Sequence, residues 1–314
     1  MYQNLVLTLK IKIMTALEFI KLKQKACAER KGFTLLSGTI GSETGNKMYF
    51  DDYNKNLYAK LSEDNKNAYN KGSGGEIRDT TTRHAPMKAT FSSSAIVVNL
   101  FQYWQEKNKI SPLLEALGLK NKEVEKETKI VFEAKNPIKE IGGYPPHLDV
   151  VITTDTNNFA IESKFTEPYN NGSDKNSEIQ DSYIKKETLW ENLPNLGQLA
   201  QAIHNPNNPI EKEEIKELIE KLRKTKHLDA SQLIKHILGL KSKHGKKFKL
   251  LYLWYDVPGT EGYEHRQEIE YFKKLVKDKV DFRHITYQEV IFYLKENHYA
   301  EHEDYIDYLV ERYL

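Results

Sequence analysis

The chain has 314 residues and a mass of 36.6 kDa, enough for one large hydrophobic core or two smaller ones. Its 47 Lys and Arg residues nearly balance 45 Asp and Glu residues, so the net charge of +2 neither supports nor excludes nucleic-acid binding. Cys27 is the single cysteine, which excludes a disulfide framework or a zinc cluster and favours the reducing cytoplasm. No stretch reaches the roughly 18 apolar residues of a membrane span, so we expect no membrane association.

The first elements are expected to be helical and then irregular. Residues 1–13 lack the features of a signal peptide and are expected to be a poorly ordered leader or an edge strand. Thr15 and Glu18 stand at capping-box spacing, which predicts a helix over 15–31. Residues 37–90 are rich in Gly, Asn, Ser, Asp and Lys, which indicates loops and short strands with a mobile segment near 62–75.

Two helices and three strands are expected next. Residues 92–107 are apolar almost all round after a run of serines, which predicts a buried helix with a serine N-cap. Ser111 as N-cap and Pro112 at the first helical position predict a short helix over 111–119. The apolar runs at 127–134, 147–153 and 158–165 predict strands, and "TDTNN" predicts a tight turn between the last two.

The remaining chain is expected to alternate helices and strands. The polar segment 170–195 is predicted to be a long functional loop. The strand at 247–257 is apolar almost throughout, which favours a central position in a sheet covered on both sides. The other predicted elements are a helix at 196–205, one or two charged helices within 209–240, a helix at 262–279, a strand at 281–287 and a helix at 288–298.

This order predicts an α/β fold with a mixed central β-sheet flanked by helices. We expect residues 1–109 to form an N-terminal helical and loop region that packs on a core of residues 110–314. The inserted loop and helices at 170–240 belong to that core. The alternative is that the two parts form one continuous domain.

Three charges at the ends of the predicted hairpin carry the chemistry. Side chains alternate faces along a strand, so Glu162 and Lys164 share one face. A register that pairs Asp149 with Glu162 or with Lys164 places all three on one surface. Two carboxylates can hold a hard divalent cation such as Mg²⁺, for which Mn²⁺ can substitute, and such a cation activates water and stabilises charge on a phosphoryl oxygen. The alternative is a cross-strand salt bridge on a solvated face.

Asp149, twelve residues, and then Glu162-Ser163-Lys164 on adjacent strands resemble the PD-(D/E)xK nuclease superfamily, which includes many restriction endonucleases. The stretches "GSGGEI", "PMKATFSSSAIVVNLF", "PPHLDVVI" and "IESKFTE" are similar to one bacterial restriction-endonuclease-like branch of it, over roughly residues 70–290. The resemblance implies a restriction-endonuclease-like core. Leu148 stands where a proline is loosely kept before the aspartate.

The resemblance also implies roles for individual residues. Asp149 and Glu162 would be catalytic metal ligands, the main-chain carbonyl of Ser163 a further ligand, and Lys164 the catalytic lysine. A third acidic ligand would be Glu76 or Glu133, between which the sequence does not choose. On the helix after the lysine strand, Gln198 or Gln201 would be an accessory residue that reaches the site, with an ordinary exposed helix face as the alternative.

Several basic residues in loops are candidate DNA contacts, because Lys, Arg and Asn bind phosphates. For each of them a solvated surface position is the alternative. The candidates are Arg83, His84, Lys88, Lys175, Lys185, Lys186, Lys246 and Lys247.

Together these observations predict a Mg²⁺-dependent endodeoxyribonuclease of the type II restriction kind that cuts double-stranded DNA. A homodimer would supply one site per strand, and a cognate DNA methyltransferase would be encoded nearby. One alternative is a non-catalytic or repair and recombination DNA-binding protein on the same fold. A glycoside hydrolase also uses two carboxylates but predicts no nearby lysine and activity that survives a chelator.

Overall fold

The computed structural model describes residues 14–72, 75–107, 109–119, 128–170 and 175–314. The predicted leader at 1–13 therefore lies outside the described residues. The helices are α1 (Ala16–Arg30), α2 (Glu63–Lys71), α3 (Ser93–Lys107), α4 (Ser111–Ala116), α5 (Asp181–Ile184), α6 (Pro194–His204), α7 (Glu213–Leu222), α8 (Ala230–His244), α9 (Thr260–Val276), α10 (Tyr287–His298) and α11 (Glu303–Tyr313).

The centre of the molecule is a five-stranded mixed sheet in the spatial order β3-β4-β5-β6-β7. The first three strands form an antiparallel meander, and β5, β6 and β7 run parallel. The strands are β3 (Thr128–Lys135), β4 (His147–Thr154), β5 (Asn158–Lys164), β6 (Lys249–Trp254) and β7 (Phe282–Thr286), and a separate pair consists of β1 (Leu36–Ser37) and β2 (Lys47–Tyr49). The predicted α/β fold with a mixed sheet is confirmed.

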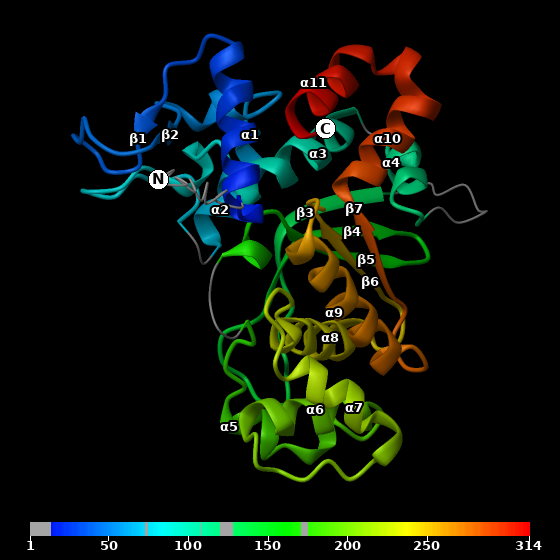
Figure 1. The fold of residues 1–314 in the computed structure, drawn as a ribbon. Helices are drawn as coiled ribbons and strands as arrows, with labels where there is room; N and C mark the ends of the chain where they lie inside the picture. Colours follow the sequence, from blue (N-terminus) through cyan, green and yellow to red (C-terminus); the bar gives the residue numbers. More distant parts are fainter. Residues whose placement is uncertain (1–13, 73–74, 108, 120–127, 171–174) are drawn as a thin grey trace, which may run out of the picture.

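Helices cover both faces of this sheet (Figure 1). One face packs against α1–α4, α10 and α11 through side chains such as Val150 and Ile161. The opposite face packs against α5–α9 through side chains such as Ala160 and Leu250. The strand β6 lies between β5 and β7 and is buried on both sides, which confirms the central position predicted from its apolar run.

Local signals placed several helices correctly. Thr15 and Glu18 form the capping box of α1, and Ser92 accepts a hydrogen bond from the Ala95 N–H at the start of α3. Thr286 forms a second capping box with Glu289, so β7 passes directly into α10. The expected N-cap at Ser111 is wrong, because Ser111 is the first residue of α4 and Ile110 precedes the helix.

Two expectations for secondary structure are corrected. The segment predicted to be mobile near 62–75 contains the helix α2, which Ser62 caps and which buries Tyr69 against the sheet. Tyr69 is the one large apolar residue of this polar helix, so the sequence shows no apolar periodicity that would predict it. The sequence also gave no element after 298, whereas α11 follows and buries Tyr305, Ile306 and Leu309.

The side-chain alternation of β3 and β4 breaks where the site begins. Phe132 and Val150 pack on the α3 face, but Ala134 and Leu148, two residues away on the same strands, pack on the α8 face. Glu133 lies between them with a φ of 50°, the one non-glycine positive φ among the described residues. A left-handed residue inside a strand is unfavourable and turns the chain, which accounts for the change of face in β3.

Candidate active site

The predicted hairpin is present, and its register brings the expected charges together. The β4–β5 ladder pairs Val151 with Ala160 and Val150 with Ile161, so its next step would pair Asp149 with Glu162. This is one of the two registers predicted from the sequence. The strands separate at that step, and the Asp149 carboxylate accepts a hydrogen bond of 2.7 Å from the Ser163 N–H in place of a backbone partner.

Glu162 and Lys164 form a close pair at the end of β5. The Lys164 Nζ donates to Glu162 Oε1 at 2.6 Å, and the Glu162 side chain is only 3 % exposed. Burial opposes ionisation of Glu162, but the charge of Lys164 and the interaction with His236 outweigh it and lower the pKa of Glu162 to about 2. Burial also opposes the charge of Lys164, yet the carboxylates of Glu162, Glu167 and Asp149 raise its pKa. The pair is therefore held in its ionised form.

The pKa of Asp149 is shifted in the opposite direction to that of Glu162. Burial, and then the negative charge of Glu162, raise the pKa of Asp149 well above its ordinary value, although Lys164 and the Ser163 N–H act against this. Two carboxyl groups this close cannot both ionise easily without a further positive charge. The site thus has one ionised carboxylate, one carboxyl whose ionisation is opposed, and a single lysine.

Two further acidic residues stand beside this pair. Burial, and then the negative charges of Glu76 and Glu162, raise the pKa of Glu133 to about 7. Burial raises the pKa of Glu76, whose carboxylate accepts a hydrogen bond of 2.8 Å from Ser94 at the start of α3. Gly72 follows α2 and lies directly against Glu133, because a Cβ at this position would stand 2.7 Å from Glu133 Oε2. Both sequence candidates for a third acidic residue therefore lie near the site.

The sequence did not point to two histidines that the fold brings to the same place. His236 on α8 is 1 % exposed, and its Nε2 lies 3.0 Å from Glu162 Oε2. His147 at the start of β4 lies with Nδ1 3.6 Å from Glu133 Oε2. Burial, and then the charges of Lys135 and His236, lower the pKa of His147. The one signal in the sequence was that His236 stands among the apolar residues of a helix, and this pattern does not indicate which residue the histidine contacts.

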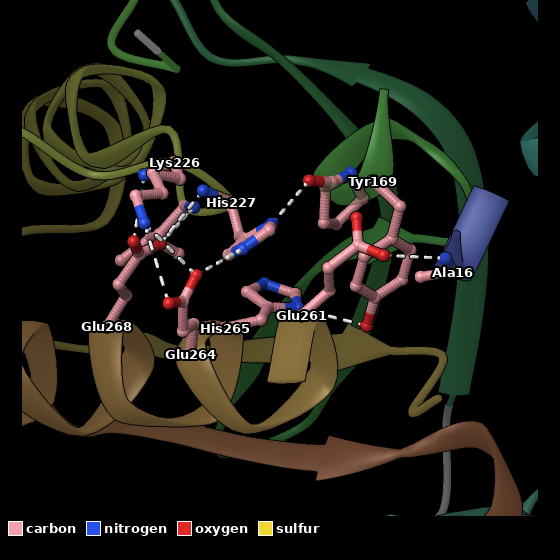
Figure 2. Close-up of polar contacts among 10 residues, drawn as sticks. Ala16, Tyr169, Lys226, His227, Glu261, Glu264, His265 and Glu268 are labelled. Carbon is pink, nitrogen blue, oxygen red and sulfur yellow. Dashed lines mark hydrogen bonds and ion pairs between the residues drawn. The ribbon is translucent and has the colours of Figure 1, made fainter. Parts of the chain in front are cut away.

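Hydrogen bonds beyond the site fix the exit of β5. The Tyr169 hydroxyl donates to the Tyr255 carbonyl at 2.9 Å, and Tyr252 contacts His265 Nε2 at 3.0 Å. Figure 2 shows Tyr169 beside His265, and the contacts of Lys226 and His227 with Glu264 and Glu268 of α9. His227 lies 2.8 Å from the Pro168 carbonyl and 3.4 Å from Glu264. These contacts join the segment after Lys164 to β6 and α9.

The other predicted site residues lie apart from this cluster. Gln198 is half-buried and Gln201 is exposed, both on α6, and Gln198 Oε1 is buried without a hydrogen-bond partner among the described residues. Lys88 and His84 face Asp79, at 2.7 and 3.6 Å, and Lys185 pairs with Asp181. Lys175 donates to the Glu167 carbonyl at 3.0 Å and to that of Asn170. The remaining basic candidates, Arg83, Lys186, Lys246 and Lys247, are exposed.

The donor set can be compared with the needs of a cation. Asp149, Glu162 and the Ser163 carbonyl offer oxygen donors of the kind that hard divalent cations bind. Burial and the negative charge of Glu162 oppose ionisation of Asp149, and a bound cation would favour it. Across the described parts of the chain, however, no three His, Cys, Asp or Glu side chains are already grouped to hold a metal ion. The residues fit a cation site built on two carboxylates and a main-chain oxygen, not a cage of side chains.

The mixed sheet, with helices on both faces and a carboxylate–lysine pair where two strands separate, is a restriction-endonuclease-like fold. The chain belongs to the family described as "Restriction Endonuclease associating with ARP", whose model matches residues 22–314. No curated protein and no solved structure matches the chain. No helix in the described segments has the length and apolar character needed to cross a membrane.

Proposed function

We propose that the protein is a Mg²⁺-dependent endodeoxyribonuclease of the PD-(D/E)xK kind that hydrolyses phosphodiester bonds of double-stranded DNA. The observation that carries this proposal is the convergence of Asp149, Glu162 and Lys164 where β4 and β5 separate. Membership of a restriction endonuclease family supports it. The type II mode of restriction, the homodimer and the nearby methyltransferase belong to the same proposal.

Each central residue has a part in the proposed reaction. Asp149, Glu162 and the Ser163 carbonyl would hold the cation, which supplies water activation and charge stabilisation on the phosphate when it is bound. Glu133 is the better candidate for a third acidic residue, because it stands opposite Asp149 on β3 and carries a strained backbone. Glu76 is held by a hydrogen bond from Ser94 and acts on Glu133 through its charge.

Lys164 would act on the attacking water or on the developing negative charge. Its ammonium group bonds to Glu162 and is kept charged by the surrounding carboxylates. A charged donor suits stabilisation of the negative charge that develops on the phosphoryl oxygens. We therefore assign Lys164 the role of charge stabiliser.

The DNA would approach over the surface at the exit of β5, where Lys175 lies. Lys246 and Lys247 are exposed at the other end of β5, beside Asn158, and so lie away from the site. Contacts to phosphates from such residues give affinity that falls steeply with salt. The family description names an association with ARP, and an ARP partner for this chain is a further part of the proposal.

Plasmid cleavage tests the proposal directly. We expect the full chain to convert supercoiled plasmid to nicked and linear forms with Mg²⁺ and to stop on addition of EDTA. Lys164→Ala and Asp149→Asn should each lower the rate by about 100-fold or more, in line with the loss of charge stabilisation at a transition state. Lys274→Ala removes an exposed lysine of α9 and should leave the rate unchanged. Absence of cleavage with every divalent cation and DNA tested would refute the nuclease assignment.

A further inference from the structure

One buried group beside the proposed nuclease site has no part in the reaction described so far. His236 lies on α8 and is 1 % exposed, and its Nε2 is 3.0 Å from Glu162 Oε2. At this separation an Nε2–H can donate to the Glu162 carboxylate, although the ring is not ideally aligned for the bond. A buried polar ring needs such a partner, so the contact with Glu162 offers a reason for its position.

The helix that carries His236 is brought unusually close to the sheet. Gly239 follows His236 by three positions and so lies on the same side of α8. A Cβ at Gly239 would stand 2.3 Å from the Asn136 carbonyl oxygen and 3.0 Å from Pro146, in the segments that join β3 to β4. Only glycine permits this approach. The close packing delivers the His236 ring to the end of β5.

His236 and Lys164 together occupy both oxygens of the Glu162 carboxylate. Lys164 Nζ contacts Oε1 at 2.6 Å and His236 Nε2 contacts Oε2 at 3.0 Å. A carboxylate with one contact can rotate about its terminal torsion, whereas contacts on both oxygens fix its plane. A ligand that is oriented in advance loses less entropy when it binds, and the groups that orient it affect affinity strongly.

We propose that His236 is a positioning residue that fixes the orientation of the Glu162 carboxylate in the nuclease site, with Oε1 held toward Lys164. This inference rests on the proposed function. His236 acts through Glu162 and does not touch the DNA. Loss of such an orienting partner typically lowers metal affinity or activity about 10- to 100-fold.

A pair of substitutions separates this role from simple filling of the core. His236→Gln keeps an N–H donor at a similar reach, whereas His236→Leu keeps the volume and removes the donor. Core filling predicts that leucine is tolerated better than glutamine, because it buries no polar group. Positioning predicts the reverse order for activity. His204→Gln on α6, where the ring contacts the Ile179 carbonyl at 2.8 Å, is the matched control within the same inserted segment.

The experiment measures three quantities on the full chain and these variants. They are the rate of plasmid cleavage at several Mg²⁺ concentrations, the affinity for Mn²⁺ by electron paramagnetic resonance, and thermal unfolding by circular dichroism. We expect His236→Leu to stay folded, to cleave about 10- to 100-fold more slowly and to bind Mn²⁺ more weakly by a similar factor. His236→Gln should recover most of both, and His204→Gln should match the wild type.

Each outcome bears on one of the two proposals. A folded His236→Leu that cleaves and binds Mn²⁺ like the wild type would overturn the positioning role and leave the nuclease assignment intact. If the leucine variant does not fold, His236→Asn replaces it, because its shorter side chain should not reach Oε2, and activity equal to the glutamine variant would overturn the proposal. If the wild type binds Mn²⁺ but cleaves no DNA, the proposed function fails and the Mn²⁺ affinities alone decide the role of His236. If it does neither, both proposals fail.

Discussion

At the scale of single residues, the site is organised by unequal ionisation. Glu162 is ionised between Lys164 and His236, while the ionisation of Asp149 and Glu133 is opposed by burial and by their acidic neighbours. Such divergence of carboxyl pKa values within a few ångströms is typical of functional sites, because a structural ion pair needs only one acid and one base. The simple cross-strand salt bridge accounts for Glu162 and Lys164 but not for the extra acids.

Glu133 gives a prediction for the dependence of stability on pH. The pKa of Glu133 is about 7 in the folded chain against 4.5 for the free group, so the folded state keeps a proton that the unfolded chain releases. The free energy of unfolding therefore falls as the pH rises through about 4.5 to 7, by at most about 3 kcal/mol from this group. Glu133→Gln removes this loss, so the variant should exceed the wild type in thermal stability at pH 8 and differ little from it at pH 5.

Thermal unfolding without divalent cations at the two pH values measures this effect. Glu191→Gln changes an exposed glutamate and should behave like the wild type at both. A difference between Glu133→Gln and the wild type that is the same at pH 5 and pH 8 would show that the carboxyl of Glu133 does not titrate in this window.

At the scale of elements, the site depends on how one helix and one strand meet. The helix α8 lies in the segment between β5 and β6, and Gly239 lets it touch the chain that joins β3 to β4. The strand β3 changes face at Glu133, opposite Asp149. Both features place acidic and histidine side chains at the point where β4 and β5 separate.

Gly239→Ala should therefore affect stability and activity together. The added methyl group would overlap the Asn136 carbonyl and push α8 from the sheet, which we expect to cost about 1–3 kcal/mol of unfolding free energy. The same shift moves His236 from Glu162 and should lower the cleavage rate. Urea unfolding and plasmid cleavage measure the two effects, with Gln232→Ala, a half-buried residue of the same helix, as control. A variant as stable as the wild type would mean that α8 has room to move without cost.

At the scale of the whole molecule, the first and last described helices complete one core. The helix α11 packs on α1 and α3, where the Tyr305 hydroxyl donates to the Leu100 carbonyl at 2.9 Å. Gln24 of α1 donates to the Arg312 carbonyl at 2.9 Å, and Lys23 donates to the carbonyls of the last two residues. The helix α10 packs in the same core, and its Tyr287 hydroxyl contacts the Ser163 hydroxyl of β5 at 2.7 Å.

Leu309→Ala tests how much this packing stabilises the fold. Leu309 is 1 % exposed within the core formed by α1, α3 and α11, so its truncation should lower the unfolding free energy by about 2–5 kcal/mol. Because Leu309 lies outside the proposed catalytic cluster, cleavage measured well below the melting temperature should be retained. Val310→Ala, at a partly buried neighbouring position, should cost much less. Equal effects of the two substitutions would show that α11 is not integral to the core.

The sequence by itself determined the mixed sheet, the hairpin from 147 to 164 and two allowed registers for Asp149, of which the structure has the one that sets it against Glu162. Periodicity, turn residues and strand alternation act over a few neighbouring positions, and these features are local. The predicted boundary near residue 109, the roles of the site residues and the Mg²⁺ requirement stay predictions. Only the tertiary structure decided that His236, Glu76 and Glu133 surround the pair, that α2 is a helix and that α11 closes the core. These depend on contacts between segments far apart in the chain, which the composition and periodicity of any one segment do not encode.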